Sequence, residues 1–304
     1  MKPETRNMKT WILLAVLTSS MLISCQGNEK KEKKIEPTET ASMVVPKTWI
    51  KRRVEKAKTS LQQTDAGKVV WDAMEAHGGL EKYYSNGYLS FHFNYQPLGE
   101  GVPRNTYQIV DTWSNKARQK EAKDTTLQYG WNGETAWKVV KDSTSIPYDT
   151  RFWALTPYYF SAIPFVLDGA GVNLELLPQT TYKGQLNDVV KVTFAESTGD
   201  APDDYYILYF SAESHKLTVI RYIVSYPAYF KKGQHMPEKF MDVFGEQVVE
   251  GITFPKSYKT YWLAADNLPG EYITAIELSE ISFKKDVKKT YFDPPKDAVI
   301  VDGL

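Results

Sequence analysis

The spacing of apolar residues changes once along this chain, and the change separates expected helices from expected strands. Apolar residues recur at helical spacing from Thr48 to Leu61 and from Ala66 to Ala76. Thr64-Asp65 can cap the second of these helices, and Gly78-Gly79 can end it. A short turn from Leu80 to Tyr84 then leads into the first expected strand.

After Gly87 the period of the apolar residues becomes two. Leu89, Phe91 and Phe93 alternate with polar residues, and comparable segments continue to residue 283, which predicts about ten strands joined by short loops. The dipeptide Asn132-Gly133 is favoured in hairpin turns. Consecutive hairpins predict an antiparallel meander, and a sheet of this size is expected to curl or close.

One apolar segment interrupts the strands. This cover segment, Arg151 to Val172, contains Pro157 and Pro164 and ends in glycines. Thr156 can cap a helix that starts at Pro157, and Pro164 can end that helix or begin another. Because the short helices are apolar on nearly every face, we expect them to be buried on the concave side of the sheet. They can act there as a fixed core plug or as a mobile lid.

The N-terminus has the features of an export signal. Lys9 precedes a short apolar stretch, and the run Leu22-Ile23-Ser24-Cys25 resembles the lipobox of bacterial lipoproteins. The resemblance implies cleavage before Cys25, acylation of that residue with palmitate-type chains, and attachment to a membrane. Gln26, in place of aspartate, implies sorting to the outer membrane, on a face that the sequence leaves open. The alternative is an ordinary signal peptide with a chance cysteine.

These features divide the chain into three parts. We expect a signal peptide over residues 1–24, a lipidated cysteine with a disordered tether over 25–46, and one β domain with N-terminal helices over 47–304.

Without residues 1–24 the chain has 34 basic and 36 acidic residues, so no strong electrostatic field attracts nucleic acid. Cys25 is the only cysteine, which leaves it no partner for a disulfide.

Motifs for catalysis are not apparent. The sequence has no nucleophile elbow, phosphate loop or dinucleotide fingerprint. The four histidines, His77, His92, His215 and His235, do not occur at metal-ligand spacing. We therefore expect a protein that is not an enzyme and has neither a metal nor another cofactor. A glycosidase would need two carboxylates at a set separation, which a sequence cannot test.

Aromatic residues are the main candidates for binding. They make up 13% of the chain and suit either an apolar cavity or a platform for sugars. We expect the candidates to line an apolar cavity or to cover it, unless they are simply core residues. They are Trp131, Trp137, Trp153, Tyr158, Tyr159, Phe160, Ile163 and Phe165.

Several short motifs resemble those of a known group. They are Ala76-His77-Gly78-Gly79-Leu80-Glu81, the run from Tyr129 to Trp137, and Tyr291-Phe292-Asp293-Pro294-Pro295, in addition to the lipobox. They resemble uncharacterised lipoproteins of Bacteroidota, which are similar to the LolA/LolB-like superfamily of lipoprotein carriers and receptors. The resemblance covers roughly residues 64–304. It implies a strongly curved antiparallel half-barrel with short helices over its concave face. Arg118 and Arg151 are candidates for the superfamily's cavity arginine.

The leading hypothesis from the sequence is an anchored, non-enzymatic envelope lipoprotein. Its half-barrel would hold a hydrophobic ligand, such as a lipid or the acyl chain of a lipoprotein, beneath the cover segment. Two alternatives remain open at this point. One is a surface lipoprotein that binds or processes glycans, and the other is a structural envelope protein whose cavity is filled by its own side chains.

Overall fold

One antiparallel sheet of thirteen strands organises the protein in the computed structural model, which describes residues 45–196 and 198–301. The strands run in the spatial order β13-β5-β4-β3-β2-β1-β12-β11-β10-β9-β8-β7-β6. Their bounds are β1 Tyr88–Pro97, β2 Arg104–Asp111, β3 Lys116–Glu121, β4 Gln128–Trp131, β5 Ala136–Val139, β6 Val172–Tyr182, β7 Gln185–Phe194, β8 Tyr206–Ser211, β9 Leu217–Tyr222, β10 Lys239–Val249, β11 Ile252–Leu263, β12 Pro269–Lys284 and β13 Val299–Val301. The predicted signal peptide and Cys25 lie outside the described residues.

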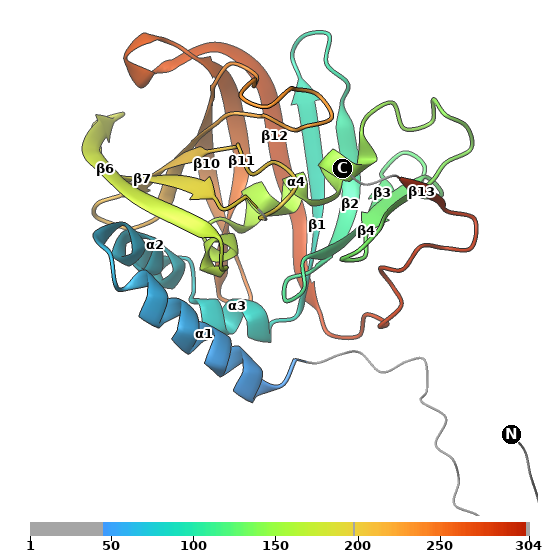
Figure 1. Ribbon diagram of the computed structural model, residues 1–304, viewed down its shortest axis with the longest axis horizontal. Coiled ribbons are helices and arrows are strands. Elements are labelled where there is room, and N and C mark those ends of the chain that lie inside the picture. Colours follow the sequence, from blue (N-terminus) through green and yellow to red (C-terminus); the bar gives the residue numbers. More distant parts are fainter. Residues whose placement is uncertain (1–44, 197, 302–304) are drawn as a thin grey trace, which may run out of the picture. The chain divides into compact units, whose positions relative to one another are not determined.

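The predicted curved antiparallel half-barrel is confirmed. The sheet is open and bends around a central helix (Figure 1). It contains more than the expected ten or so strands, partly because β13 (Val299–Val301) adds to the edge beside β5. Two meanders, β1 to β5 and β6 to β12, are joined through the pairing of β1 with β12. In that pairing Phe93 lies opposite Leu278, so the alternating apolar residues of both strands face the same side.

The chain crosses the sheet between β5 and β6. Because β5 lies next to one edge of the sheet and β6 forms the other edge, the connection must span the full width. It does so through helix α4 (Thr150–Ala162) and the short 3-10 helix η1 (Phe165–Asp168). Figure 1 shows α4 running inside the curve of the sheet. The concave side is therefore covered by the segment that the sequence indicated.

Helix α4 begins seven residues before the predicted start at Pro157. Asp149 caps it by accepting hydrogen bonds from the backbone N–H groups of Arg151 and Phe152, so the predicted cap at Thr156 is wrong. Thr156 instead donates its hydroxyl to the Phe152 carbonyl within the helix. Pro157 lies in the helix interior rather than at its first turn. Pro164 ends the helical run and precedes η1, as predicted.

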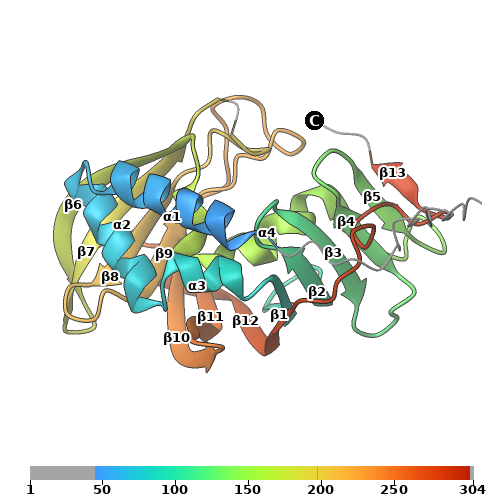
Figure 2. The same ribbon diagram turned by 90° about the horizontal axis from the view of Figure 1, so that it is seen from below.

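Three further helices, α1 (Lys47–Leu61), α2 (Asp65–Ala76) and α3 (Leu80–Ser85), gather at one end of the sheet (Figure 2). Thr64 caps α2 through its hydroxyl, which accepts from the Gly67 N–H at 3.1 Å. Gly67 is required there because a Cβ would lie 2.0 Å from the Leu61 carbonyl oxygen. None of the helices in the described residues combines the length and the apolar character needed for a bilayer span.

The two faces of the sheet bury different amounts of apolar surface. The concave face, α4, η1 and the three N-terminal helices share one large hydrophobic cluster. The opposite face carries a small cluster centred on Val189, Tyr209, Val219 and Phe240. A second small cluster there involves Tyr88 and the C-terminal Phe292. The largest cluster of buried apolar side chains thus lies on the concave side, between the sheet and the helices that cover it.

Candidate functional site

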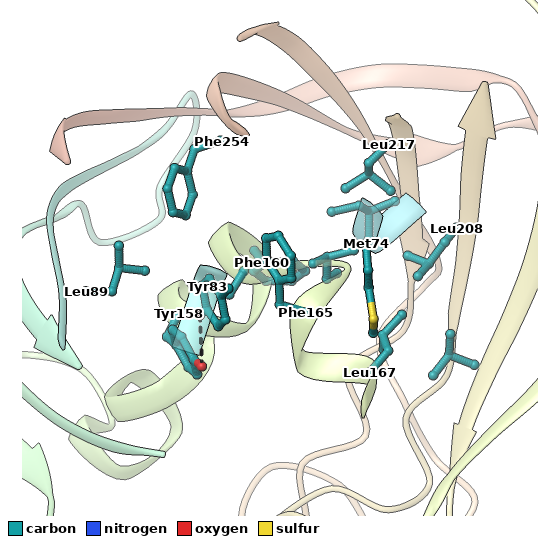
Figure 3. Close-up of a cluster of buried hydrophobic side chains, with 14 of the residues drawn as sticks. Met74, Tyr83, Leu89, Tyr158, Phe160, Phe165, Leu167, Leu208, Leu217 and Phe254 are labelled. Carbon is teal, nitrogen blue, oxygen red and sulfur yellow. Dashed lines mark hydrogen bonds between the residues drawn. The ribbon is translucent and has the colours of Figure 1, made fainter. Parts of the chain in front are cut away.

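The candidate site is the concave face together with the cover segment that fills it. Phe165 stacks on Tyr83 of α3 with ring centroids 4.3 Å apart. Phe160 packs against Tyr222 of β9 at 5.0 Å, and its carbonyl accepts a hydrogen bond of 2.9 Å from the Tyr258 hydroxyl. Figure 3 shows Phe160 and Phe165 pointing into the cluster between helices and strands. The cover segment therefore occupies the space in which an apolar guest would pack.

Pro157 explains how α4 is held to the sheet. Proline has no N–H, so the carbonyl of Trp153, four residues earlier, cannot receive its helical hydrogen bond. The side-chain amide of Gln119 on β3 donates to that carbonyl at 2.7 Å and to the Ala154 carbonyl at 2.9 Å. The Gln119 amide oxygen accepts from the Tyr129 hydroxyl at 2.5 Å. A buried glutamine thus replaces the bond that the proline removes.

Two tyrosines with buried hydroxyls connect α4 to the N-terminal helices. The Tyr83 hydroxyl donates to that of Tyr158 at 3.1 Å, and both side chains are almost fully buried (Figure 3). Burial raises the pKa of each phenol, so both stay protonated at neutral pH. Tyr159 lies on another side of the helix, 4.9 Å from Tyr206, and its buried hydroxyl has no partner among the described residues.

Ion pairs fasten both ends of the cover segment. At its start, Arg151 donates to Asp200 at 2.5 Å and lies 3.7 Å from the ring centre of Trp131. At its end, Asp168 accepts from Arg53 of α1 and from the Tyr84 hydroxyl. The middle of the segment is anchored mainly by apolar contacts.

The structure brings together seven of the eight aromatic and apolar residues that the sequence singled out. Those that lie on the concave side are Trp131, Trp153, Tyr158, Tyr159, Phe160, Ile163 and Phe165. Trp137 lies on the opposite face, where its indole N–H donates to the Phe292 carbonyl at 2.9 Å. Arg118 also faces that side and donates to the Tyr291 carbonyl, so only Arg151 of the two candidate arginines reaches the cover segment.

Sequence reasoning missed two cations on the concave face, Arg104 and Lys239. Each is the first residue of its strand. The side chain of Arg104 points to the same face as that of buried Thr106, and the side chain of Lys239 to the same face as that of buried Met241. A charged residue at an inward-facing position was the available signal, but it depends on knowing where the strand begins.

Two hollows open on the surface. One of about 240 Å³ is lined by polar residues that include Lys183 and Asp242. Another of about 420 Å³ lies between the loops that carry Pro202 and Phe230. No group of three or more potential metal ligands occurs in residues 45–196 and 198–301. The hollow of about 420 Å³ borders the large hydrophobic cluster, because its lining residues Ala201 and Phe230 pack against that cluster.

The fold of this chain resembles the folds of other solved protein structures. The chain is similar to a LolA superfamily protein. That protein comes from Nitrosomonas europaea, and the two share 9% identity with a TM-score of 0.49 over 75% of this chain and 97% of the other. A DUF1329 family protein from Desulfovibrio piger shares 12% identity with a TM-score of 0.47 over 80% and 97%. No protein-family profile and no curated protein matches the sequence.

Proposed function

We propose that this protein is a non-enzymatic envelope lipoprotein, anchored through Cys25, that holds the acyl chain of an amphiphile on its concave face. One observation carries this proposal. The segment that fills the concave face crosses from one edge of the sheet to the other and is fastened by ion pairs near its two ends. Its middle contributes apolar side chains, and an acyl chain offers the same kind of surface.

A bound acyl chain can replace side chains of the cover segment at little net cost in apolar contacts. Each buried methylene of an acyl chain contributes roughly 0.8 kcal/mol, so a long chain can supply about 10 kcal/mol before the costs of binding. A guest that takes the place of Phe160 and Phe165 would recover the apolar contacts that these side chains lose. The binding step is thus a competition between two apolar occupants for one face.

A second candidate function is structural. The dense packing of Phe160, Ile163 and Phe165, all nearly fully buried, favours a permanent plug. In that case the protein would be an envelope component without a lipid ligand. The glycan alternative gains less support, because most of the candidate aromatic rings are buried and so offer no open platform for a sugar.

Lipid uptake separates these candidates. Residues 25–304 with Cys25→Ala would be purified and incubated with an envelope lipid extract, and the bound lipids would be identified by mass spectrometry. A pyrene-labelled dodecanoic acid would measure binding directly. Stoichiometric lipid with saturable uptake is the result that we expect. Lipid-free protein that takes up no probe would exclude the carrier and favour the structural plug.

A further inference from the structure

Two cations lie without acidic partners at the end of the concave face opposite α1, α2 and α3. Strand β1 starts at Tyr88 beside α3, so its far end is paired with Arg104, the first residue of β2 (Figure 1). Lys239, the first residue of β10, pairs with Tyr222 at the end of β9. Neither cation forms an ion pair within the described part of the chain, whereas Arg53, Arg151 and Arg221 each do.

Aromatic rings surround the guanidinium group of Arg104. Its central carbon lies 4.1 Å from the ring centre of Trp153 on α4, 5.0 Å from that of Tyr95 and 5.1 Å from that of Tyr148. Nη1 donates to the Val102 carbonyl. The Nε–H group is buried and has no acceptor among the described residues. Arg104 as a whole is only partly buried, so one buried donor, the Nε–H group, remains free beside the aromatic rings.

Lys239 has a similar environment. Its ammonium group lies 5.6 Å from the ring centre of Tyr222 and 5.5 Å from that of Trp262, and it contacts the Met236 sulfur at 3.9 Å. Burial, and to a lesser extent the positive charge of Arg104, lower the pKa of Lys239 to about 8. The two cations thus act on each other across the same end of the face.

Two further polar groups, the Thr260 hydroxyl and the Glu121 carboxylate, lie near these cations. The Thr260 side chain is 2% exposed and pairs across the sheet with Met241, two residues from Lys239, yet its hydroxyl has no partner among the described residues. The carboxylate of Glu121 accepts a hydrogen bond from the Tyr148 hydroxyl and forms no ion pair with Arg104, although its charge acts on Arg104 through space. Keeping an N–H group and a hydroxyl buried without partners is costly, so the Arg104 Nε–H and the Thr260 hydroxyl suit an anion that accepts from both.

We propose that Arg104, Lys239 and the Thr260 hydroxyl bind the anionic head group, a carboxylate or a phosphate, of the amphiphile held on the concave face. This inference rests on the proposed function, because the acyl chain would lie in the place of the cover segment. Phe160 contacts Tyr222, whose backbone pairs with Lys239, and Trp153 covers Arg104. The two cations therefore flank the stretch of α4 from Trp153 to Phe160, where the acyl chain would lie. Guanidinium and ammonium donors both suit carboxylate and phosphate oxygens.

Two probes that share one acyl chain but differ in charge at the head group test the proposed binding of an anion. Residues 25–304 with Cys25→Ala would be titrated with pyrene-labelled dodecanoic acid and with its methyl ester. We expect the acid to bind at least tenfold more tightly. Equal binding of acid and ester would overturn the head-group site while leaving the proposed function in place. If neither probe binds, both proposals fail.

Phospholipid probes identify the source of the anion. Pyrene-labelled phosphatidic acid and diacylglycerol with identical chains would be compared in the same assay. A preference for phosphatidic acid together with the free fatty acid supports a site for phosphate and carboxylate alike. A preference for the free fatty acid alone supports a site for free carboxylates.

Substitutions test the residues themselves. Arg104→Met and Lys239→Met should each reduce the preference for acid over ester at least fivefold and leave the affinity for the ester unchanged. Arg118→Met is the matched control, because Arg118 also lies over a tryptophan but on the opposite face. It should keep the full preference. Should Arg104→Met fail to fold, Lys239→Met decides, and an unchanged preference in folded Lys239→Met overturns the assignment.

Discussion

Arg53 on α1 and Asp168 at the end of η1 are joined by two hydrogen bonds, of 2.6 and 2.9 Å, although 115 residues separate them in the chain. The Asp168 side chain is 3% exposed and that of Arg53 is 27% exposed. Arg53 also lies 4.3 Å from the ring centre of Tyr84 and donates to the Trp113 carbonyl. One arginine thus ties the cover segment to α1, to α3 and to the turn after β2.

Removing that arginine should loosen the end of the cover segment. In Arg53→Met the buried carboxylate of Asp168 keeps only the hydroxyl of Tyr84, so we expect the free energy of unfolding to fall by about 2 kcal/mol in a urea titration. Lys68→Met is the control, because Lys68 pairs with Asp65 on the exposed surface and should cost less than about 0.5 kcal/mol. Equal effects would mean that the Arg53 pair contributes no more than a surface pair.

A charge in the middle of the cover segment should be far more damaging. Phe160→Asp places a carboxylate among the rings of Tyr159, Tyr206 and Tyr222. We expect a loss of about 3–5 kcal/mol in urea unfolding, or no folding. Leu268→Asp, at a side chain that is 50% exposed, should unfold almost as the parent does. Normal stability of Phe160→Asp would place that side chain in water.

Gln119 and Pro157 should be energetically coupled. Gln119→Leu leaves the Trp153 and Ala154 carbonyls and the Tyr129 hydroxyl without their partner, and we expect it to cost about 2–3 kcal/mol. Adding Pro157→Ala supplies an N–H that can bond the Trp153 carbonyl within the helix. The double variant should therefore recover part of the loss. Purely additive urea-unfolding energies would show that Gln119 does not replace the missing helical bond.

Stability should depend on pH through Lys239. Its pKa is about 8 in the folded protein against 10.5 ordinarily, so between those values the unfolded chain binds a proton that the folded chain has lost. Stability of lipid-free protein should rise by about 1–2 kcal/mol from pH 7.5 to 9.5, relative to Lys239→Met. Burial keeps Tyr222 protonated in this window by raising its pKa. Parallel pH profiles for parent and variant would show that Lys239 is well solvated.

The membrane anchor is tested separately from the fold. Cys25→Ala in the full chain should abolish labelling by radioactive palmitate and release the protein into the soluble envelope fraction, because the lipobox cysteine is the proposed attachment point. Ser24→Ala, which keeps a small residue before the cleavage site, should still be labelled. Labelling that persists in Cys25→Ala would exclude the lipobox.

Local patterns were sufficient for the elements of this fold. The helical spacing around Val70 and Met74, the alternation through Leu89, Phe91 and Phe93, and the Asn132-Gly133 turn all depend on neighbours in the chain. Backbone geometry converts such spacing directly into a face of a helix or strand. The predicted start of α4 was seven residues too late, because the helix continues through Pro157 and is capped by Asp149 instead of Thr156.

The sequence by itself therefore determined the strands, the helices and the apolar cover segment, since each is encoded within a few adjacent residues. Only the tertiary structure decided that β5 and β6 lie near opposite edges, that Trp137 faces away from α4, and that Arg104 and Lys239 share one end of the concave face. These relationships depend on strand order and curvature. Both are set by contacts between residues as distant as Phe93 and Leu278, which no local pattern contains.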